Sequence, residues 1–318
     1  RRSRRFRPRQ AHALERISGP ARFILKRRER PRSCRHWQLV DARPRASPEA
    51  KIAATSHRLV SIGLATVHGI ESAPMPTQNR VEPLVQAARS LSSQVGVLKF
   101  GAPVASVYNP LQYAWRSHEE YLRRFGKPPK RVIFLGMNPG PFGMVQTGIP
   151  FGEIKAVRDW IGIQAPIEKP ASCHPKRPIL GFACPRSEVS GQRLWKLFAD
   201  RFGTAESFFQ DHFVVNYCPL AFVEQSGCNR TPDKLPASER QPLFGACDDH
   251  LRRNVELLDP EWVVGIGAFG AKRAEAVCVP LGVQVCQILH PSPASPAANR
   301  DWAACTTAEL IKAGIWND

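Results

Sequence analysis

The 318-residue sequence lacks several patterns that would point directly to a function. It has no Walker or dinucleotide-binding glycine fingerprint, which disfavours a nucleotide-binding α/β protein. Its nine cysteines show no CxxC pair or regular metal spacing, so we expect reduced, mostly buried thiols, no metal and no iron–sulfur cluster. No stretch approaches the ~18 apolar residues of a membrane span, and no apolar segment follows the basic first ten residues. We therefore expect a soluble, intracellular protein without a cofactor or a membrane partner.

The positive charge is concentrated at the beginning of the chain. Residues 1–74 contain 18 Lys and Arg against 5 Asp and Glu, whereas residues 75–318 contain 27 against 22. The first segment is rich in Arg, Pro and Ser and has no sustained periodicity, so we expect it to be a disordered basic arm. Because residue 1 is not Met and the next segment begins at Met75, an over-extended gene start or a removed transit segment is the alternative. As an arm, it would add non-specific affinity for DNA. We expect a single globular domain over residues 75–318.

Four short apolar runs predict buried strands, at residues 132–135, 213–217, 262–267 and 283–289. Apolar residues at helical spacing predict helices between and around these strands. The expected helices span residues 80–91, 111–125, 154–161, 191–202 and 238–258, a segment from Ala268, and residues 299–313. Residues 164–190 have no clear pattern. Strands that alternate with helices predict an α/β domain with a central, mainly parallel four-stranded sheet flanked by helices.

The most informative segment is 131–153, RVIFLGMNPGPFGMVQTGIPFGE. An apolar strand ends here in glycines, which let a ligand approach the backbone, and in prolines, which restrict the loop. We expect a rigid pocket rim at the carboxyl end of the strand, where open α/β sheets bind ligands. Asn216 lies at the end of a predicted strand and His290 follows another, so they and Asn138 are expected to share one crevice. A glycine-rich connection without chemistry is the alternative.

These residues resemble the motifs of one known enzyme family. Residues 136–153 and the HPSP segment at 290–293 are similar to the motifs of the single-strand-selective monofunctional uracil-DNA glycosylases. The resemblance covers about residues 75–316 and implies the three-layer uracil-DNA glycosylase fold. It implies hydrolysis of the N-glycosidic bond of uracil, and of 5-hydroxymethyluracil, in single- and double-stranded DNA without lyase activity, which initiates base-excision repair. It also implies a monomeric protein whose partner is DNA. Such a protein would lie in the nucleus of a eukaryote or in the cytoplasm of a bacterium.

The resemblance also implies a role for each polar group of the crevice. Asn216 is expected to contact N3–H and O4 of uracil, since an amide carries both a donor and an acceptor. Cytosine would leave these groups unpaired, at a cost of ~1 to 3 kcal/mol each. The Phe151 ring is expected to stack on the base, and His290 to donate a hydrogen bond to O2 as negative charge builds there. Asn138, which cannot act as a general base, is expected to orient the attacking water.

Further residues follow from the same resemblance. The backbone of Met137 and the loop near Gly140 are expected to line the pocket beside C5 of the base, where a polar substituent would displace a water. Lys176 and Arg177 fit the DNA contacts that this region makes in the family, although they could equally belong to a plain solvated loop. Apart from the resemblance, Lys155 and Arg158 on the helix expected after the loop are available to phosphate.

The loop after His290 is expected to enter the duplex as a wedge when the base is extruded. Its expected DNA-contacting residues are Ser292, Pro293, Ala294, Ser295 and Arg300. Ala294 stands where the vertebrate-type wedge carries an Arg, so we expect weaker insertion and a stronger bias toward single strands.

Two alternatives remain open at this point. A mismatch-specific uracil/thymine DNA glycosylase shares an Asn-Pro-Gly first motif, but the HPSP segment at 290–293 disfavours it. A non-catalytic DNA-damage-binding protein would use the same fold, but Asn138, Asn216 and His290 all match the active pattern.

Overall fold

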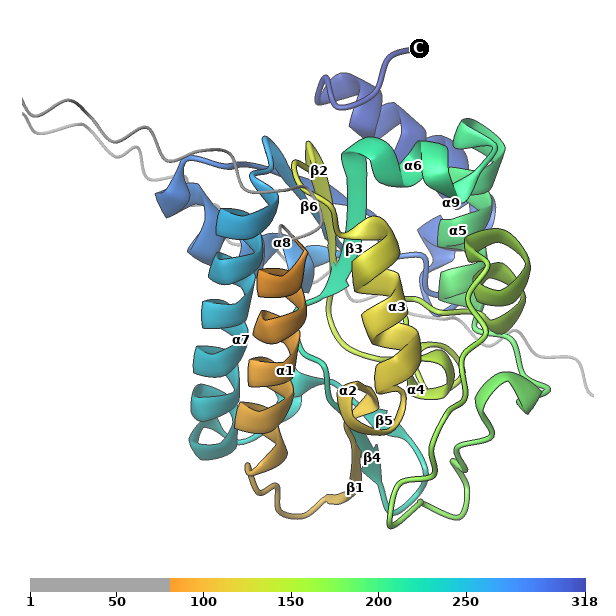
Figure 1. Ribbon diagram of the computed structural model, residues 1–318, viewed down its shortest axis with the longest axis vertical. Coiled ribbons are helices and arrows are strands. Elements are labelled where there is room, and N and C mark those ends of the chain that lie inside the picture. Colours follow the sequence, from red (N-terminus) through yellow and green to blue (C-terminus); the bar gives the residue numbers. More distant parts are fainter. Residues whose placement is uncertain (1–80) are drawn as a thin grey trace, which may run out of the picture. The chain divides into compact units, whose positions relative to one another are not determined.

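The parallel sheet forms where the sequence places its four apolar runs. In the computed structural model, which describes residues 81–318, the strands are β2 (Val132–Gly136), β3 (His212–Asn216), β6 (Trp262–Ile266) and β7 (Gln284–Ile288). They are all parallel and pair in the order β3-β2-β6-β7. Every residue of β2 is buried, because this inner strand is covered on both faces. The predicted central parallel sheet is confirmed (Figure 1).

Helices cover both faces of the sheet (Figure 1). One layer consists of α1 (Glu82–Gly96), α3 (Trp115–Phe125), α7 (Ala237–Leu258) and α8 (Ala268–Cys278). The other consists of α5 (Val189–Phe202), α6 (Ala205–Asp211) and α9 (Pro296–Lys312). Phe213 of β3 stacks on Tyr121 of the first layer, with ring centroids 5.0 Å apart. Phe134 of β2 packs against Phe198 of the second layer, also at 5.0 Å. Side chains of neighbouring strands therefore pack against the helices of both layers, within one continuous apolar core.

Three predicted helices have a different form in the structure. The expected helix at 111–125 is divided into α2 (Pro110–Tyr113) and α3, because Ala114 between them is not helical (φ −109°, ψ 24°). The segment Ala156–Ile161 is a π-helical turn, which begins where the Glu153 carboxylate accepts a hydrogen bond from the Ala156 N–H at 2.9 Å. Helix α9 begins at Pro296, before the predicted start, and is kinked at Asp301. Such local breaks do not change the spacing of the apolar residues, so the sequence pattern could not predict them.

A second, antiparallel sheet was not predicted. It consists of β1 (Val104–Tyr108), β4 (Ala221–Glu224) and β5 (Asn229–Arg230), in the order β1-β4-β5. The register of β1 shifts between Val104 and Ser106, and β5 has only two residues, so neither gives a clear period of two. The four predicted strands therefore form the parallel sheet, and the three strands of this second sheet were missed. Because β4 follows β3 after a short connection, this sheet extends the edge at which the parallel strands end.

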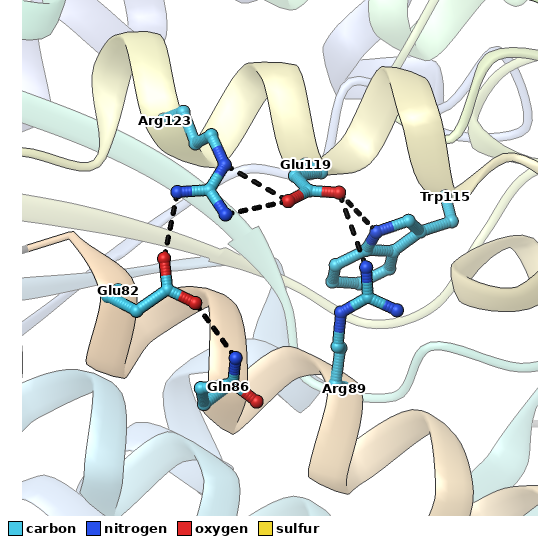
Figure 2. Close-up of polar contacts among 6 residues, drawn as sticks. All are labelled: Glu82, Gln86, Arg89, Trp115, Glu119 and Arg123. Atoms are coloured by element: carbon cyan, nitrogen blue, oxygen red, sulfur yellow. Dashed lines mark hydrogen bonds and ion pairs between the residues drawn. The ribbon is translucent and has the colours of Figure 1, made fainter.

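A surface network of polar side chains joins α1 to α3 (Figure 2). Arg123 bonds to Glu82 of α1 at 2.9 Å and to Glu119 of its own helix at 2.7 Å. Arg89 of α1 reaches Glu119 at 3.3 Å and lies 4.0 Å above the Trp115 ring. Exposed ion pairs of this kind contribute about 0 to 1 kcal/mol each. The buried apolar residues between the two helices therefore supply most of the stability of this contact.

Residues 81–318 belong to one compact unit. The expected basic arm at 1–74 and residues 75–80 lie outside the described residues. No helix in the described part is both long and apolar enough to cross a membrane.

His212 at the start of β3 connects the sheet to the end of the chain. Its ring is 3% exposed, with Nδ1 3.2 Å from the Phe208 carbonyl oxygen and Nε2 3.1 Å from the Trp316 indole nitrogen. The indole N–H can only donate, so Nε2 accepts and Nδ1–H donates to Phe208, which is the neutral imidazole. Burial lowers the pKa of His212 to about 4. Protonation would place two donors face to face at Trp316.

The free energy of unfolding should therefore fall on acidification. The pKa of His212 is lowered in the folded state, so between about pH 6.5 and pH 4 the unfolded chain binds a proton that the folded chain does not. Stability falls as the pH falls through this window, by up to about 3 kcal/mol for this residue. Urea unfolding of the full chain at pH 7.5 and 4.5 should show a smaller loss for His212→Gln, whose amide can make both hydrogen bonds without titrating. An equal loss in both proteins would contradict the assignment.

Candidate active site

A cavity of about 430 Å³ lies at the carboxyl edge of the parallel sheet. Gly136 at the end of β2 pairs with Asn216 at the end of β3, and the backbone continues the pairing as Cys218 N–H donates to the Met137 carbonyl oxygen at 2.9 Å. The cavity is lined by Met137, Asn138, Gly140, Pro141, Phe151, Glu188, Ser190, Asn216, Asn229, Thr231, His290 and Ser292. The structure thus brings together the predicted Asn138, Asn216 and His290, and with them Met137, Gly140 and Phe151.

Phe151 has an unusual backbone conformation. Its φ of 52° lies in the left-handed region, which a bulky residue rarely adopts. Trp195 of α5 donates from its indole N–H to the Phe151 carbonyl oxygen at 2.9 Å. Gly191 of the same helix lies so close that a Cβ there would be 2.1 Å from that oxygen. Helix α5 therefore holds the turn that carries the Phe151 ring.

Gly136 leaves room for two side chains that line the cavity. A Cβ at this position would lie 2.3 Å from Asn216 Oδ1 and 2.5 Å from the Phe151 ring. Both side chains thus occupy space that any other residue at the end of β2 would fill. The motif glycine at 136 is explained by this close approach.

Asn216 offers an unused acceptor to the cavity. Its Oδ1 is buried and has no hydrogen-bond partner among residues 81–318, whereas its Nδ2 lies 3.2 Å from the Met144 sulfur. A buried carbonyl oxygen left unpaired costs about 1–3 kcal/mol. An N–H group of a bound ligand would satisfy Oδ1.

His290 follows β7 and faces the Phe151 ring, with ring centroids 6.1 Å apart and planes inclined at 42°. Trp302 of α9 donates to the carbonyl oxygen of Leu289 at 2.6 Å, which ties the segment before His290 to the helix layer. Burial lowers the pKa of His290, so the ring is neutral at neutral pH. A neutral imidazole can donate one hydrogen bond into the cavity.

Asn138 is held at the cavity rim. Its Nδ2 donates to the Leu220 carbonyl oxygen at 3.2 Å, in the connection between β3 and β4. This bond fixes the amide plane, and the half-buried side chain remains in contact with the cavity.

Glu188 and Ser190 line the cavity but were not predicted as site residues. Glu188 precedes α5 directly, at the end of the segment that had no clear pattern. An acidic residue before a helix is commonly explained by the helix dipole, so the sequence carries no specific signal for a cavity residue there.

The predicted wedge residues form a loop with its own hydrogen bonds. The Ser292 hydroxyl accepts from the Ala294 N–H at 3.2 Å, and the Asn299 amide donates to the Pro293 carbonyl oxygen at 2.8 Å. Ser295 caps α9, since its hydroxyl accepts from Ala298 N–H at 3.4 Å. Of the predicted set, Ser292 reaches the cavity, Pro293 and Ala294 are exposed at the turn, and Arg300 is exposed on α9.

None of the basic residues expected to contact phosphate lines the cavity. Lys155 and Arg158 are exposed, and Arg158 is paired with Asp159 at 2.6 Å. Lys176 donates to the Ser226 carbonyl oxygen at 3.2 Å. Arg177 and the unpredicted Arg186 approach the ring of Phe142, at 5.4 and 4.0 Å from its centroid. Phe142 belongs to the 136–153 motif, so these two cations flank that loop.

The cysteines are free in the described residues. The expectation that most are buried is wrong, because only Cys218, Cys247 and Cys278 are buried, whereas Cys173, Cys228 and Cys305 are exposed. Within residues 81–318, no group of three His, Cys, Asp or Glu side chains is placed to hold a metal ion.

Comparisons with known proteins agree with this geometry. Residues 123–311 match the family model of the uracil DNA glycosylase superfamily. The single-strand selective monofunctional uracil DNA glycosylase of Bos taurus is 46% identical over 248 residues, which are 77% of this chain and 91% of that protein. The enzyme of the same name from Mus musculus is 46% identical over 245 residues, or 76% of this chain and 88% of that protein. A crystal structure of wild-type Pedobacter heparinus SMUG2 covers 74% of this chain and 95% of its own, with a TM-score of 0.51 and 17% identity, which supports the fold alone.

The parallel sheet with its cavity and the matched family model define the class, the uracil DNA glycosylase superfamily. Within it, the chain belongs to the family of single-strand selective monofunctional uracil DNA glycosylases. The resemblance seen in residues 136–153 and 290–293 is thereby confirmed.

The contact between Gly191 and Phe151 leads to a prediction. Gly191→Ala should lower the free energy of unfolding by about 1–3 kcal/mol, because the added methyl group meets the Phe151 carbonyl oxygen. Gly245→Ala is the matched control, since it lies in α7 with open space around it and should be neutral or stabilising by about 0.5–1 kcal/mol. Urea unfolding of the full chain measures both. Equal effects in the two variants would show that α5 does not constrain the Phe151 turn.

Proposed function

We propose that this protein is a monofunctional DNA glycosylase that hydrolyses the N-glycosidic bond of uracil in DNA and initiates base-excision repair. The observation that carries the proposal is the buried, unpaired Oδ1 of Asn216 in one cavity with the Phe151 ring and the neutral His290. Uracil has the N–H, the carbonyl groups and the flat face that these three side chains can bind. The names of the relatives support the same activity.

Each side chain has a proposed part in the reaction. The uracil base leaves the stack and lies on Phe151, while Asn216 Oδ1 accepts from N3–H and Nδ2 donates to O4. As the bond between C1′ and N1 breaks, negative charge develops on uracil O2, and the neutral His290 ring stabilises it by donating a hydrogen bond. Asn138 orients the water that attacks C1′; this water loses a proton to solvent, and the departing uracil anion takes up a proton from solvent. The products are free uracil and an abasic site.

The absence of lyase activity fits the composition of the cavity. Among the described residues that line it there is no lysine, so the cavity offers no amine for a Schiff base with the abasic sugar. The release of one base needs one active site, so a monomer is proposed as the active form. The Met137 backbone and Gly140 are proposed to border C5 of the base, which makes 5-hydroxymethyluracil the second expected substrate.

DNA outside the cavity is proposed to contact basic and loop residues. Arg177 and Arg186, which flank Phe142, and the exposed Lys155 and Arg158 are available to phosphates. Ser292, Pro293, Ala294 and Ser295, with Arg300 on α9, are proposed to contact the strand at the gap left by the extruded base.

Replacement of the two proposed catalytic residues tests the mechanism. Asn138→Ala and His290→Ala should each lower the single-turnover rate of uracil release about 10²–10³-fold, the usual effect of removing a group that stabilises developing charge or positions the nucleophile. The measurement is cleavage of a uracil-containing single-stranded oligonucleotide by the full chain. Asn317→Ala, an exposed asparagine far along the chain from the cavity residues, should retain the parent rate. Tight binding of the lesion without base release by the parent would favour a damage-binding protein instead.

The wedge leads to a second prediction. The small, exposed Ala294 fills little of the space left in a duplex, so uracil release should be faster from single than from double strands. Ala294→Arg should raise the double-strand rate severalfold and change the single-strand rate less. Equal parent rates on the two substrates would contradict this role for the loop.

A further inference from the structure

Glu188 places a carboxyl group against the loop of the 136–153 motif. A Cβ on Gly140 would lie 1.5 Å from its Oε1, and a Cβ on Gly143 would lie 1.9 Å from its Oε2. The carboxyl group therefore occupies the space that these two glycines leave free. Because Glu188 also lines the cavity, its position is defined by the same loop that borders the proposed base site.

This carboxyl group has bonding capacity that the chain does not use. Oε2 is buried and has no hydrogen-bond partner among residues 81–318. Burial, and to a smaller extent the charge of the nearby buried Glu153, raises the pKa of Glu188 to about 7. The other titratable side chain of the cavity is His290, whose pKa is lowered by burial. An unpaired buried acceptor in a ligand cavity indicates a contact that the ligand or its water completes.

The contacts of Asn216 show which edge of the base meets Glu188. Its Nδ2, proposed to bind O4, lies 3.2 Å from the sulfur of Met144. Met144 follows Gly143, the residue against which Glu188 Oε2 rests. In the uracil ring C5 follows C4, the carbon that carries O4. With O2 at His290 and N3 at Asn216, the C5 edge is therefore the one that points toward Gly143, Gly140 and Glu188.

We propose that Glu188 is a specificity-determining residue that reads the substituent at C5 of the extruded pyrimidine, favouring a hydroxymethyl group and rejecting a methyl group. The proposal rests on the proposed function, because it places the base by Asn216 and His290. A hydroxyl group at C5 can donate a hydrogen bond to the carboxylate, directly or through one water. The methyl group of thymine would remove water from the carboxylate and give no hydrogen bond in return.

The ionised form of Glu188 should discriminate more strongly than the neutral acid, since a hydrogen bond to a carboxylate is about twice as strong as one between neutral groups. Bound DNA phosphate raises a carboxyl pKa further, so the relevant ionisation lies at pH 7 or above. The preference for 5-hydroxymethyluracil over uracil should therefore increase as the pH rises from 6 to 9.

The test is single-turnover release of uracil, 5-hydroxymethyluracil and thymine from otherwise identical single-stranded oligonucleotides by the full chain. Glu188→Gln should lower the ratio of 5-hydroxymethyluracil to uracil release about tenfold at pH 8, and this ratio should lose its dependence on pH. Asp200→Asn is the matched control, because Asp200 is an exposed carboxylate of α5 paired with Lys196, and it should keep the parent ratio and its pH dependence.

The ratio of the two release rates, rather than either rate alone, distinguishes recognition of the base by Glu188 from mere support of the glycine loop. If Glu188 only holds the glycine loop, Glu188→Gln slows both substrates equally, the ratio stays unchanged, and the proposal is overturned. If that variant does not fold, the parent decides the question, because a ratio that is flat from pH 6 to 9 also overturns the proposal. A parent that releases no uracil would overturn the proposed function and this inference together, whereas uracil release with an unchanged ratio would overturn the inference alone.

Discussion

The site depends on one strained residue and the contacts that hold it. Phe151 adopts a left-handed backbone conformation, which costs about 1–3 kcal/mol for a side chain of its size. The indole N–H of Trp195 fixes its carbonyl oxygen, and the missing side chain of Gly191 lets α5 approach it. The packing of α5 thus offsets the strain at Phe151 and holds its aromatic ring at the end of β2. A ring set in this way needs no rearrangement when a flat ligand arrives.

Helix α5 connects the parts of the site that lie far apart in the sequence. Glu188 directly before it reaches the glycine loop, and Gly191 and Trp195 hold the Phe151 turn. Arg193 donates to the Pro291 carbonyl oxygen at 3.3 Å and to the side chain of Asn299 at 2.9 Å, and so ties in the loop after His290. The start of one helix therefore sets the distance between the aromatic platform, the histidine and the carboxyl group.

The sequence predicted the parts of this arrangement that depend on strand ends. Four apolar runs located the parallel strands, and a parallel sheet requires that Asn138, Asn216 and His290 lie at one edge. The place of Phe151 came from the resemblance of its motif, not from its burial pattern. The role of α5 was not predictable, because a contact between Trp195 and a residue 44 positions earlier leaves no local pattern. The antiparallel sheet was missed because β1 is irregular and β5 is very short.

The position of Glu188 also bears on how an acidic group is tolerated beside DNA. A permanently ionised carboxylate would repel the phosphates that Arg177 and Arg186, beside the Phe142 ring, are proposed to contact. Burial against Gly140 and Gly143 raises the pKa of Glu188 to about 7, so the group is partly neutral at neutral pH, and approaching phosphate increases the neutral fraction. The repulsion is thereby reduced when DNA binds. The selectivity proposed for Glu188 belongs instead to its ionised fraction, which grows as the pH rises, because a charge-assisted hydrogen bond in this desolvated position is stronger than it would be in water.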